Sequence, residues 1–212
     1  ALLVTSERII FALGAGGNGR LVSWSDQENN TIWTAASTNQ AGDFELSTVG
    51  SLKAGKRVRG VNLLFTDVDV HTANYIGLPY VYSFEKAGSG CGVISSQSIA
   101  AIDTSAMWMS KSGFWQYDGY VKPMNCDVSD YVFNNINYNQ ASKVYAVHNS
   151  MFGEITWYYP SSSSNENDSY VTYNYREGHW AIGTMTRTAG TDRGVFKNPI
   201  MVSADSYIYE HE

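Results

Sequence analysis

Cysteine is almost absent from this chain of 212 residues. The two cysteines, Cys91 and Cys126, lie far apart in the sequence and form no Cys-x-x-Cys pair, which excludes a zinc site built from paired thiolates. A chain of this length can bury about 70% of its unfolded surface and needs no cross-link. We therefore expect two free thiols in a reducing compartment rather than one disulfide.

Basic residues are also few. Lys and Arg number 14 against 20 Asp and Glu, so the net charge is −6 at neutral pH. A protein that binds nucleic acid tightly needs clustered Lys and Arg to neutralise the phosphates. The excess of acidic residues therefore argues against such a protein. Charged residues make up only 16% of the chain and aromatic residues 14%, which indicates a folded chain rather than a disordered one.

Long apolar runs are missing as well. No segment approaches the ~20 residues that span a bilayer, and residues 1–17 carry Glu7 and Arg8 before a short apolar stretch. We therefore predict no signal peptide and no membrane helix. The sequence begins without Met and ends directly after a strand-like run at residues 206–210, so we expect it to be part of a longer chain.

Short runs rich in Val, Thr, Tyr, Phe and Trp recur between turn residues, which predicts an all-β chain. In residues 142–185 the pattern is clearest, and Gly178 there permits the positive φ of a tight hairpin turn. Four strands joined by local turns form an antiparallel meander, the size of one β-propeller blade. The strands expected in this stretch cover residues 143–149, 154–159, 169–175 and 180–185, with a polar loop at 160–168.

Related transitions from strand to turn recur along the chain, as a series of blades would require. Each is an apolar run that ends in Ser, Asp or Asn, residues that close turns through side-chain bonds to the backbone. We attribute the variation in their spacing to loops of different length. The five runs are centred on Val22, Leu64, Trp108, Val147 and Met201.

These patterns predict a β-propeller-like array of four-stranded antiparallel blades that occupies residues 1–212 as a single domain or most of one. A β-sandwich is the alternative, because it also places strands at regular spacing. A sandwich of this length would usually need two domains, and no linker interrupts the strands. One exception to the all-β pattern is residues 127–137, where Val128, Val132 and Ile136 predict a short helix between blades.

Asp67, Asp69 and His71 alternate along the sequence and, on a strand, would share one face as a half-site for a divalent cation. The same alternation is typical of a half-exposed strand with Val68 and Val70 turned inward. We favour this second interpretation.

The sequence contains no pattern that indicates a catalytic site. The four His residues are scattered without an HxH or HExxH motif, no GxSxG motif occurs, and the Gly-rich residues 14–19 lack the ending of a phosphate loop. We predict no catalytic residue, no metal, no cofactor and no enzymatic activity. A glycosidase needs two carboxylates on either side of the bond that it cleaves, and the spacing of the carboxylates here indicates no such pair. We interpret them as solvated side chains of loops. They are Glu154, Glu166, Asp168 and Glu177.

Several aromatic residues could stack on sugar rings, as in a lectin-like module. The alternative, which we favour, is that they fill the wedges between blades. The residues concerned are Trp24, Trp33, Trp115, Tyr158 and Tyr159.

From about Val22 to its end, the sequence resembles the tail-hub or nozzle proteins of short-tailed bacteriophages, also called packaged-DNA stabilisation proteins. The resemblance lies in the combination of several short sequence motifs. They include Ser23-Trp-Ser-Asp26, Leu64-Phe-Thr-Asp67, Tyr75-Ile-Gly-Leu-Pro79, Cys91-Gly-Val-Ile94, Met107-Trp-Met-Ser110, Gly113-Phe-Trp-Gln-Tyr-Asp-Gly119, Trp157-Tyr-Tyr-Pro160 and Tyr209-Glu-His-Glu212.

This resemblance implies a structural β-propeller of the virion tail, assembled in the bacterial host cytoplasm as a ring of six copies. Its partners would be further copies of itself, the portal and adaptor proteins above it, and tail fibres or spikes. The ring would retain the packaged genome and conduct it during ejection without sequence-specific binding, and an acidic balance suits such a channel because attraction to phosphate would slow the DNA.

Two other functions stay open at this point. One is a carbohydrate-binding or glycan-cleaving propeller for host attachment, which predicts a concave pocket with aromatics around paired carboxylates. The other is a scaffold that binds host proteins.

Overall fold

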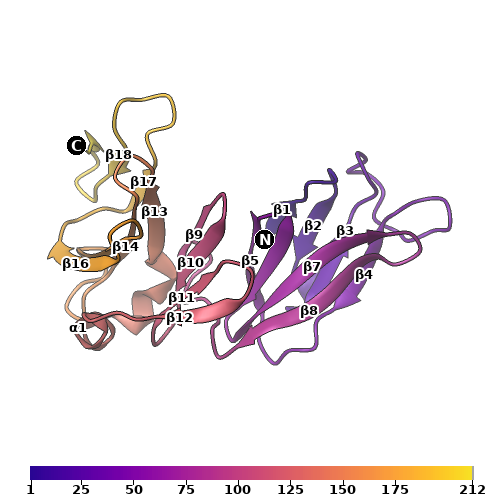
Figure 1. The fold of residues 1–212 in the computed structure, drawn as a ribbon, viewed down its shortest axis with the longest axis horizontal. Helices are drawn as coiled ribbons and strands as arrows, with labels where there is room; N and C mark the ends of the chain where they lie inside the picture. Colours follow the sequence, from indigo (N-terminus) through magenta and orange to yellow (C-terminus); the bar gives the residue numbers. More distant parts are fainter. Residues whose placement is uncertain (212) are drawn as a thin grey trace. The chain divides into compact units, whose positions relative to one another are not determined.

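The computed structural model describes residues 1–211, and strands make up most of its regular structure (Figure 1). Over these residues the strands form five antiparallel sheets, four with four strands and one with three. In each sheet, strands that follow one another in sequence pair side by side. Each sheet is therefore a meander closed by local turns, as predicted for propeller blades.

The first two sheets come from the first 89 residues of the chain. The first sheet contains β1 (Leu2–Val4), β2 (Ile10–Leu13), β3 (Leu21–Trp24) and β4 (Gly42–Glu45). The second contains β5 (Leu52–Val58), β6 (Val61–Thr66), β7 (Asp69–Gly77) and β8 (Val81–Ser89). The Gly-rich segment 14–19 forms a 3-10 turn (Ala15–Gly17) between β2 and β3, as expected for a turn.

The other three sheets complete the fold. The third contains β9 (Ile99–Ile102), β10 (Ser105–Met109), β11 (Phe114–Tyr117) and β12 (Val121–Met124). The fourth contains β13 (Tyr145–Asn149), β14 (Glu154–Tyr159), β15 (Ser169–Asn174) and β16 (His179–Thr184). The fifth contains β17 (Ala189–Thr191), β18 (Ile200–Val202) and β19 (Ile208–Glu210).

The predicted helix is confirmed as α1 (Ser129–Asn135), which follows the third sheet and buries Val132. A 3-10 segment (Tyr138–Lys143) then leads into β13. None of the helices within residues 1–211 has the length and apolar character needed to cross a membrane.

The fourth sheet matches its prediction closely, because its strands are set by local turn signals. β14 covers the predicted residues 154–159, and Gly178 has a φ of 74° in the turn before β16. The Asn174 side-chain oxygen accepts hydrogen bonds from the backbone amides of Arg176 and Glu177 and so closes this turn.

The five repeat markers all lie on strands, one in each sheet, and all five are buried. They do not occupy equivalent positions, however. Val22 is on the third strand of its sheet, whereas Val147 is on the first strand, and the other three markers are on second strands. The attribution of their unequal spacing to loop length alone was therefore wrong.

The chain divides into two compact units. The first contains residues 1–93 together with 103–106 and 117–122, and the second contains residues 94–102, 107–116 and 123–212. In the first unit, Phe11 and Trp24 of the first sheet pack against Tyr82 of the second, with ring centroids 4.7 and 5.7 Å from that of Tyr82. Such aromatic packing joins the two sheets face to face.

In the second unit, the core lies between the third and fourth sheets. Phe114 from β11 contacts Trp157 of β14 and Trp180 of β16, with ring centroids 5.0 and 4.7 Å apart. The buried Trp157 ring donates its N–H to the Ser98 carbonyl at 2.9 Å, so its polar atom is satisfied.

Candidate functional site

The two faces of the fourth sheet differ in chemistry. One face carries Ala146, Trp157 and Val171, which lie opposite one another across three strands and pack into the core. The other face carries the alternate residues of the same strands, and these are mostly Tyr, Thr, Asn and Glu. The sequence alternation at residues 169–175 therefore separates an apolar face from a polar one.

Residues that pair across the strands order the polar face into three rows. Tyr145, Tyr158 and Tyr170 form an aromatic row, in which the rings of Tyr145 and Tyr158 are stacked with centroids 5.2 Å apart. Thr156 and Thr172 form the next row, and their hydroxyl oxygens are 2.8 Å apart. The last row is polar and contains Asn149, Glu154, Asn174 and His179.

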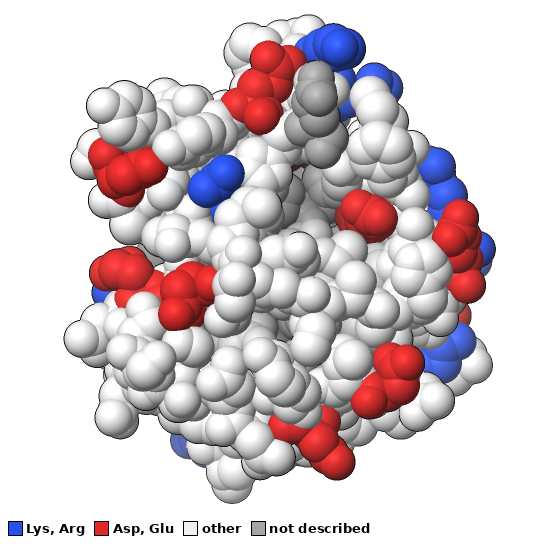
Figure 2. All heavy atoms as spheres, turned by 90° about the vertical axis from the view of Figure 1, so that its left-hand side faces the viewer, with Lys and Arg blue, Asp and Glu red and all other residues white. Residues whose placement is uncertain are grey.

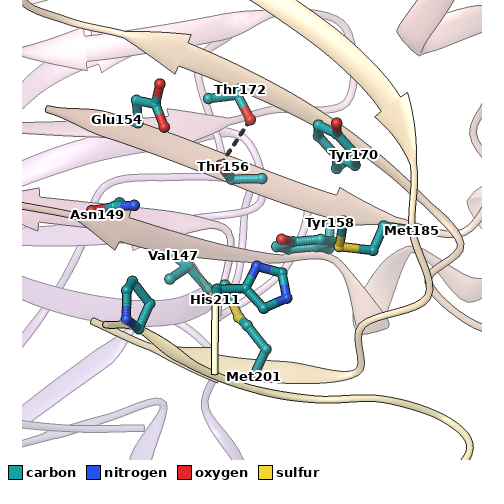
Figure 3. A pocket seen from close by; sticks show the side chains of 11 residues that line it. Val147, Asn149, Glu154, Thr156, Tyr158, Tyr170, Thr172, Met185, Met201 and His211 are labelled. Atoms are coloured by element: carbon teal, nitrogen blue, oxygen red, sulfur yellow. Dashed lines mark hydrogen bonds between the residues drawn. The ribbon is translucent and has the colours of Figure 1, made fainter. Parts of the chain in front are cut away.

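A hollow of about 220 Å³ lies over this face, and we refer to it as the polar hollow. In Figure 3 the two Thr residues lie between Glu154 at one end and the two Tyr rings at the other. Its full lining is Val147, Asn149, Glu154, Thr156, Tyr158, Tyr170, Thr172, Met185, Pro199, Met201 and His211.

His211 reaches the polar hollow from the end of the chain, below Tyr158 in Figure 3. Its Nε2 lies 2.8 Å from Nε of Arg187, which donates the hydrogen bond because a guanidinium is always protonated. Burial and the Arg187 charge both lower the pKa of His211. The imidazole is therefore neutral, with its proton on Nδ1.

Two glycines leave room for large side chains on the neighbouring strands. A Cβ on Gly183 would lie 2.5 Å from the Tyr170 hydroxyl, and one on Gly190 would lie 2.1 Å from the Met201 sulfur. Gly183 thus leaves room for the Tyr170 ring over β16, while Gly190 lets β17 and β18 pack tightly.

A second hollow of about 420 Å³ is lined by Tyr145, whose ring stacks on Tyr158 of the first hollow, and by Ala189 and Gly190 of β17. The Tyr145 hydroxyl and the Asn167 side-chain oxygen are both buried there without a hydrogen-bond partner. Burial raises the pKa of Tyr145 and raises the pKa of Tyr158 to about 12, so both phenols stay protonated.

The structure keeps Asp69 and His71 of the predicted cation half-site together, 3.2 Å apart, and places Asp67 away from them. Asp69 and His71 are buried, at 2% and 3% exposed, whereas Asp67 lies in the turn before β7. Val70 is buried, as the favoured interpretation expects, but Val68 is 38% exposed and Asp69 and His71 are buried, so that interpretation was wrong for these three residues. The hairpin turn occupies residues 67 and 68, and β7 begins only at Asp69, with its first five residues all buried.

Asp69 is held by a network of protein groups. Its carboxylate accepts hydrogen bonds from Thr66 at 2.6 Å and Thr48 at 2.9 Å, contacts Lys86 at 2.9 Å, and lies 3.2 Å from Nε2 of His71. Burial alone would raise the pKa of Asp69, but the hydrogen bonds from Thr66, Lys86 and Thr48 and the electrostatic effect of His71 lower it below its usual range. This arrangement links Asp69 to residues on three different segments of the first unit.

Among the described residues, no three His, Cys, Asp or Glu side chains come together as a metal site would require. Of the carboxylates expected to be solvated in loops, Glu166 pairs with Lys143, Asp168 accepts from Ser161, and Glu177 lies exposed in a turn. Glu154 differs from that expectation, because it is half-buried on β14 and lines the polar hollow.

The predicted aromatic residues take different positions. Trp24 and Tyr159 are buried in the cores, as blade packing requires, while Trp33 is partly exposed. Tyr158 lines the polar hollow. The alternation around β14 was the available signal for this site, since it places Tyr158 and Tyr159 on opposite faces of the sheet.

The first unit carries an aromatic groove of about 520 Å³ along β4 and β8. Its base includes Phe44 and Phe84, whose rings are stacked with centroids 4.5 Å apart. The end of the β7–β8 hairpin forms its rim, where Leu78 and Tyr80 are 66% and 76% exposed.

Charged side chains are unevenly distributed on the face of the molecule drawn in Figure 2. Acidic side chains are dispersed over this face, most of the visible Lys and Arg side chains lie toward one edge, and uncharged side chains cover the centre. This face therefore offers no basic patch of the kind that grips nucleic acid.

Comparisons with known proteins identify the fold. The N-terminal domain of Nup159 aligns with a TM-score of 0.54 at 8% identity, over 99% of this chain and 59% of that one. The CNH domain of AfRom2 aligns with a TM-score of 0.51 at 11% identity, over 100% of this chain and 70% of that one. The chain is an all-β, propeller-like protein.

The likeness concerns the fold alone. The WD40 domain of Neurospora crassa Pan2 aligns over 73% of this chain and 44% of its own length, at 6% identity and a TM-score of 0.44. The chain thus spans less than two thirds of the Nup159 and Pan2 domains. No protein-family model matches the sequence, and no curated protein matches it.

Proposed function

We propose that this propeller-like chain is a structural component of a phage tail, part of the nozzle or hub ring below the portal and adaptor. In this role it retains packaged DNA and conducts it during ejection, without enzymatic activity. Two observations support the proposal: the short sequence motifs that resemble that family, and the antiparallel meanders that resemble propeller blades. Its location is then the virion tail, after assembly in the bacterial host cytoplasm.

The observation that carries the proposal is the aromatic groove of the first unit. Ile76, Leu78 and Tyr80 are exposed beside it, and Phe44 in its base is itself 43% exposed. A contiguous exposed apolar surface of this kind is typical of a protein that is covered by a partner. We assign a second copy of this chain as that partner.

A ring needs two different surfaces on each copy, because its contacts run head to tail. The first unit also carries exposed basic residues along β5 and the turn after it, in a chain that is acidic overall; Lys53, Arg57 and Arg59 form this basic strip. Arg57 in this strip makes no ion pair with another described residue, whereas Asp43 lines the aromatic groove. Opposite charge would orient the groove of one copy toward the strip of the next.

The test is the mass of the full-length native protein in solution, measured by light scattering with and without purified portal and adaptor rings. We expect a closed ring that joins the adaptor. The double variant Ile76→Ser, Leu78→Ser should remain monomeric, whereas the matched control Val195→Ser, Phe196→Ser, at two other exposed apolar positions, should still form the ring.

Two outcomes would contradict the proposal at different levels. A stable native monomer that does not bind the adaptor would exclude the proposed role in the phage tail. If the groove variant still forms rings but no longer joins the adaptor, the groove binds the adaptor and the assignment of a second copy is wrong.

A further inference from the structure

The polar hollow contains side chains whose hydrogen-bonding capacity the protein does not use. The half-buried Glu154 carboxylate makes no hydrogen bond or ion pair with another described residue. Thr156 and Thr172 share one hydrogen bond, in which only one hydroxyl can be the donor, so the other O–H has no acceptor between them. These three side chains are half-buried and line the hollow, so their unused donors and acceptors can bind a ligand there.

Packing alone does not account for this chemistry. The opposite face of the same sheet meets its neighbour with Trp157, Val171 and other apolar side chains. A face that only had to pack against the fifth sheet would be apolar in the same way. Instead, one end of the hollow offers Asn149 and Glu154, and the middle offers two hydroxyls.

Donors and acceptors are both present around the hollow. Glu154 is an acceptor only, while the Asn149 amide nitrogen is free to donate because its oxygen accepts from the Met151 backbone amide at 3.2 Å. His211 keeps its Nδ1–H available as a donor, since Arg187 occupies Nε2. At the other end, the half-buried side chains of Tyr170 and Met185 supply apolar surface beside the buried Tyr158 ring (Figure 3).

We propose that the polar hollow binds one neutral sugar ring, the terminal residue of a glycan. A sugar ring carries hydroxyls that donate and accept around its edge and an apolar C–H face that packs on aromatic rings, which matches the distribution of groups in the hollow. The volume of about 220 Å³ is below the roughly 300–1,000 Å³ of sites for drug-sized ligands, so it suits a single ring.

The charge of the site narrows the ligand class. Glu154 is the carboxylate of the lining, and its negative charge would repel an acidic sugar. Cleavage of a glycosidic bond uses a pair of carboxylates on either side of that bond, whereas the lining supplies one. The site is therefore one of binding rather than of hydrolysis.

Saturation-transfer NMR on the purified protein tests this inference. The probes are glucose, galactose, mannose and N-acetylglucosamine at millimolar concentration, with sialic acid as the charged comparison. We expect transfer to at least one neutral sugar and none to sialic acid. Oligosaccharides ending in the same sugar should bind at least as well, which distinguishes a glycan end from a free monosaccharide that would be bound alone.

Variants then locate the site. Glu154→Gln keeps the shape of the side chain but removes its charge, and should weaken binding about tenfold, the loss expected for one hydrogen bond to a charged group. Thr172→Val should weaken it as well. The matched control is Glu177→Gln, in the exposed turn between β15 and β16, and should bind like the unaltered protein.

Two results would overturn the inference. One is the absence of transfer to every neutral sugar by the native protein. The other is binding that both Glu154→Gln and Thr172→Val leave unchanged while their thermal unfolding midpoints match that of the native chain. Neither result depends on ring formation, so the outcome is independent of the proposed role in a phage tail.

Discussion

Asp69 and His71 lie 3.2 Å apart, Oδ1 to Nε2, at a site where both side chains are almost completely shielded from solvent. Thr48, which precedes β5, donates to the same carboxylate. The Asp69 carboxylate therefore links two segments: the residues just before β5, where the second sheet begins, and the turn between β6 and β7. Such a buried carboxylate stabilises the fold only while all of its partners stay in place.

Asp69→Asn should lower the free energy of unfolding by about 2–4 kcal/mol. The amide has one acceptor oxygen in place of two, so it cannot accept from Thr48 and Thr66 and also neutralise Lys86. Urea unfolding measures this loss. Asp103→Asn, at an exposed position, is the control and should stay within about 0.5 kcal/mol of the native chain; equal losses would contradict the role given to Asp69.

The burial of His71 should make stability depend on pH. Burial lowers the pKa of His71 below its ordinary value of 6.5, and the charge of Lys86 acts in the same direction while Asp69 opposes it. Below the ordinary value the unfolded chain therefore takes up a proton that the folded chain does not, and stability falls as pH decreases. We expect the free energy of unfolding to fall between about pH 7 and pH 5.

His71→Gln should flatten this dependence, since it removes the group that titrates. His179→Gln, at an exposed position, should leave the slope unchanged. Urea unfolding at several pH values provides the measurement, and an unaltered slope in the His71 variant would mean that other groups cause the pH dependence.

The sequence predicted the parts of the fold that depend on neighbouring residues. The strands of the fourth sheet and its turn at Gly178 follow from alternation and from local turn chemistry, and β14 lies where it was expected. The helix α1 follows from the spacing of Val128, Val132 and Ile136 in the same way. These signals act over a few residues, so a single sequence is sufficient to show them.

The sites depend on contacts between distant residues, and the sequence did not show them. Thr48 and Lys86 contact the Asp69 carboxylate from distant positions in the sequence, and these contacts help to explain why it is buried at the start of β7. The same holds for Glu154, which lies at the start of a predicted strand but was interpreted as a solvated side chain. Its half-burial at the polar hollow depends on how the fourth and fifth sheets pack, which periodicity does not reveal.

Neither cysteine should be in a disulfide, and both thiols should react slowly in the folded protein. Cys91 and Cys126 form no disulfide, and burial raises the pKa of each to about 11, so little thiolate is present near neutral pH. An Ellman assay should find two thiols per chain after denaturation and little reaction before it. Ala204→Cys adds an exposed thiol as a positive control, and rapid reaction of the native wild-type thiols would contradict this prediction.

Gly92→Ala should destabilise the first unit, because the backbone of the β6–β7 turn lies against this glycine. A Cβ at this position would lie 2.2 Å from the carbonyl carbon of Asp67 and the amide nitrogen of Val68, and the Gly92 amide donates to the Val68 carbonyl at 3.1 Å. Backbone atoms held by the sheet cannot move aside as a flexible side chain can. We expect a loss of about 1–3 kcal/mol in the free energy of unfolding.

Gly113→Ala is the matched control for Gly92→Ala. Its nearest neighbour would be Nε1 of Trp115 at 3.9 Å, an ordinary van der Waals contact, and its φ is not in the left-handed region. The control should therefore stay within about 0.5 kcal/mol of the native chain. If urea unfolding gives the two variants equal midpoints, the turn can shift away from residue 92, and the close approach does not constrain the second sheet.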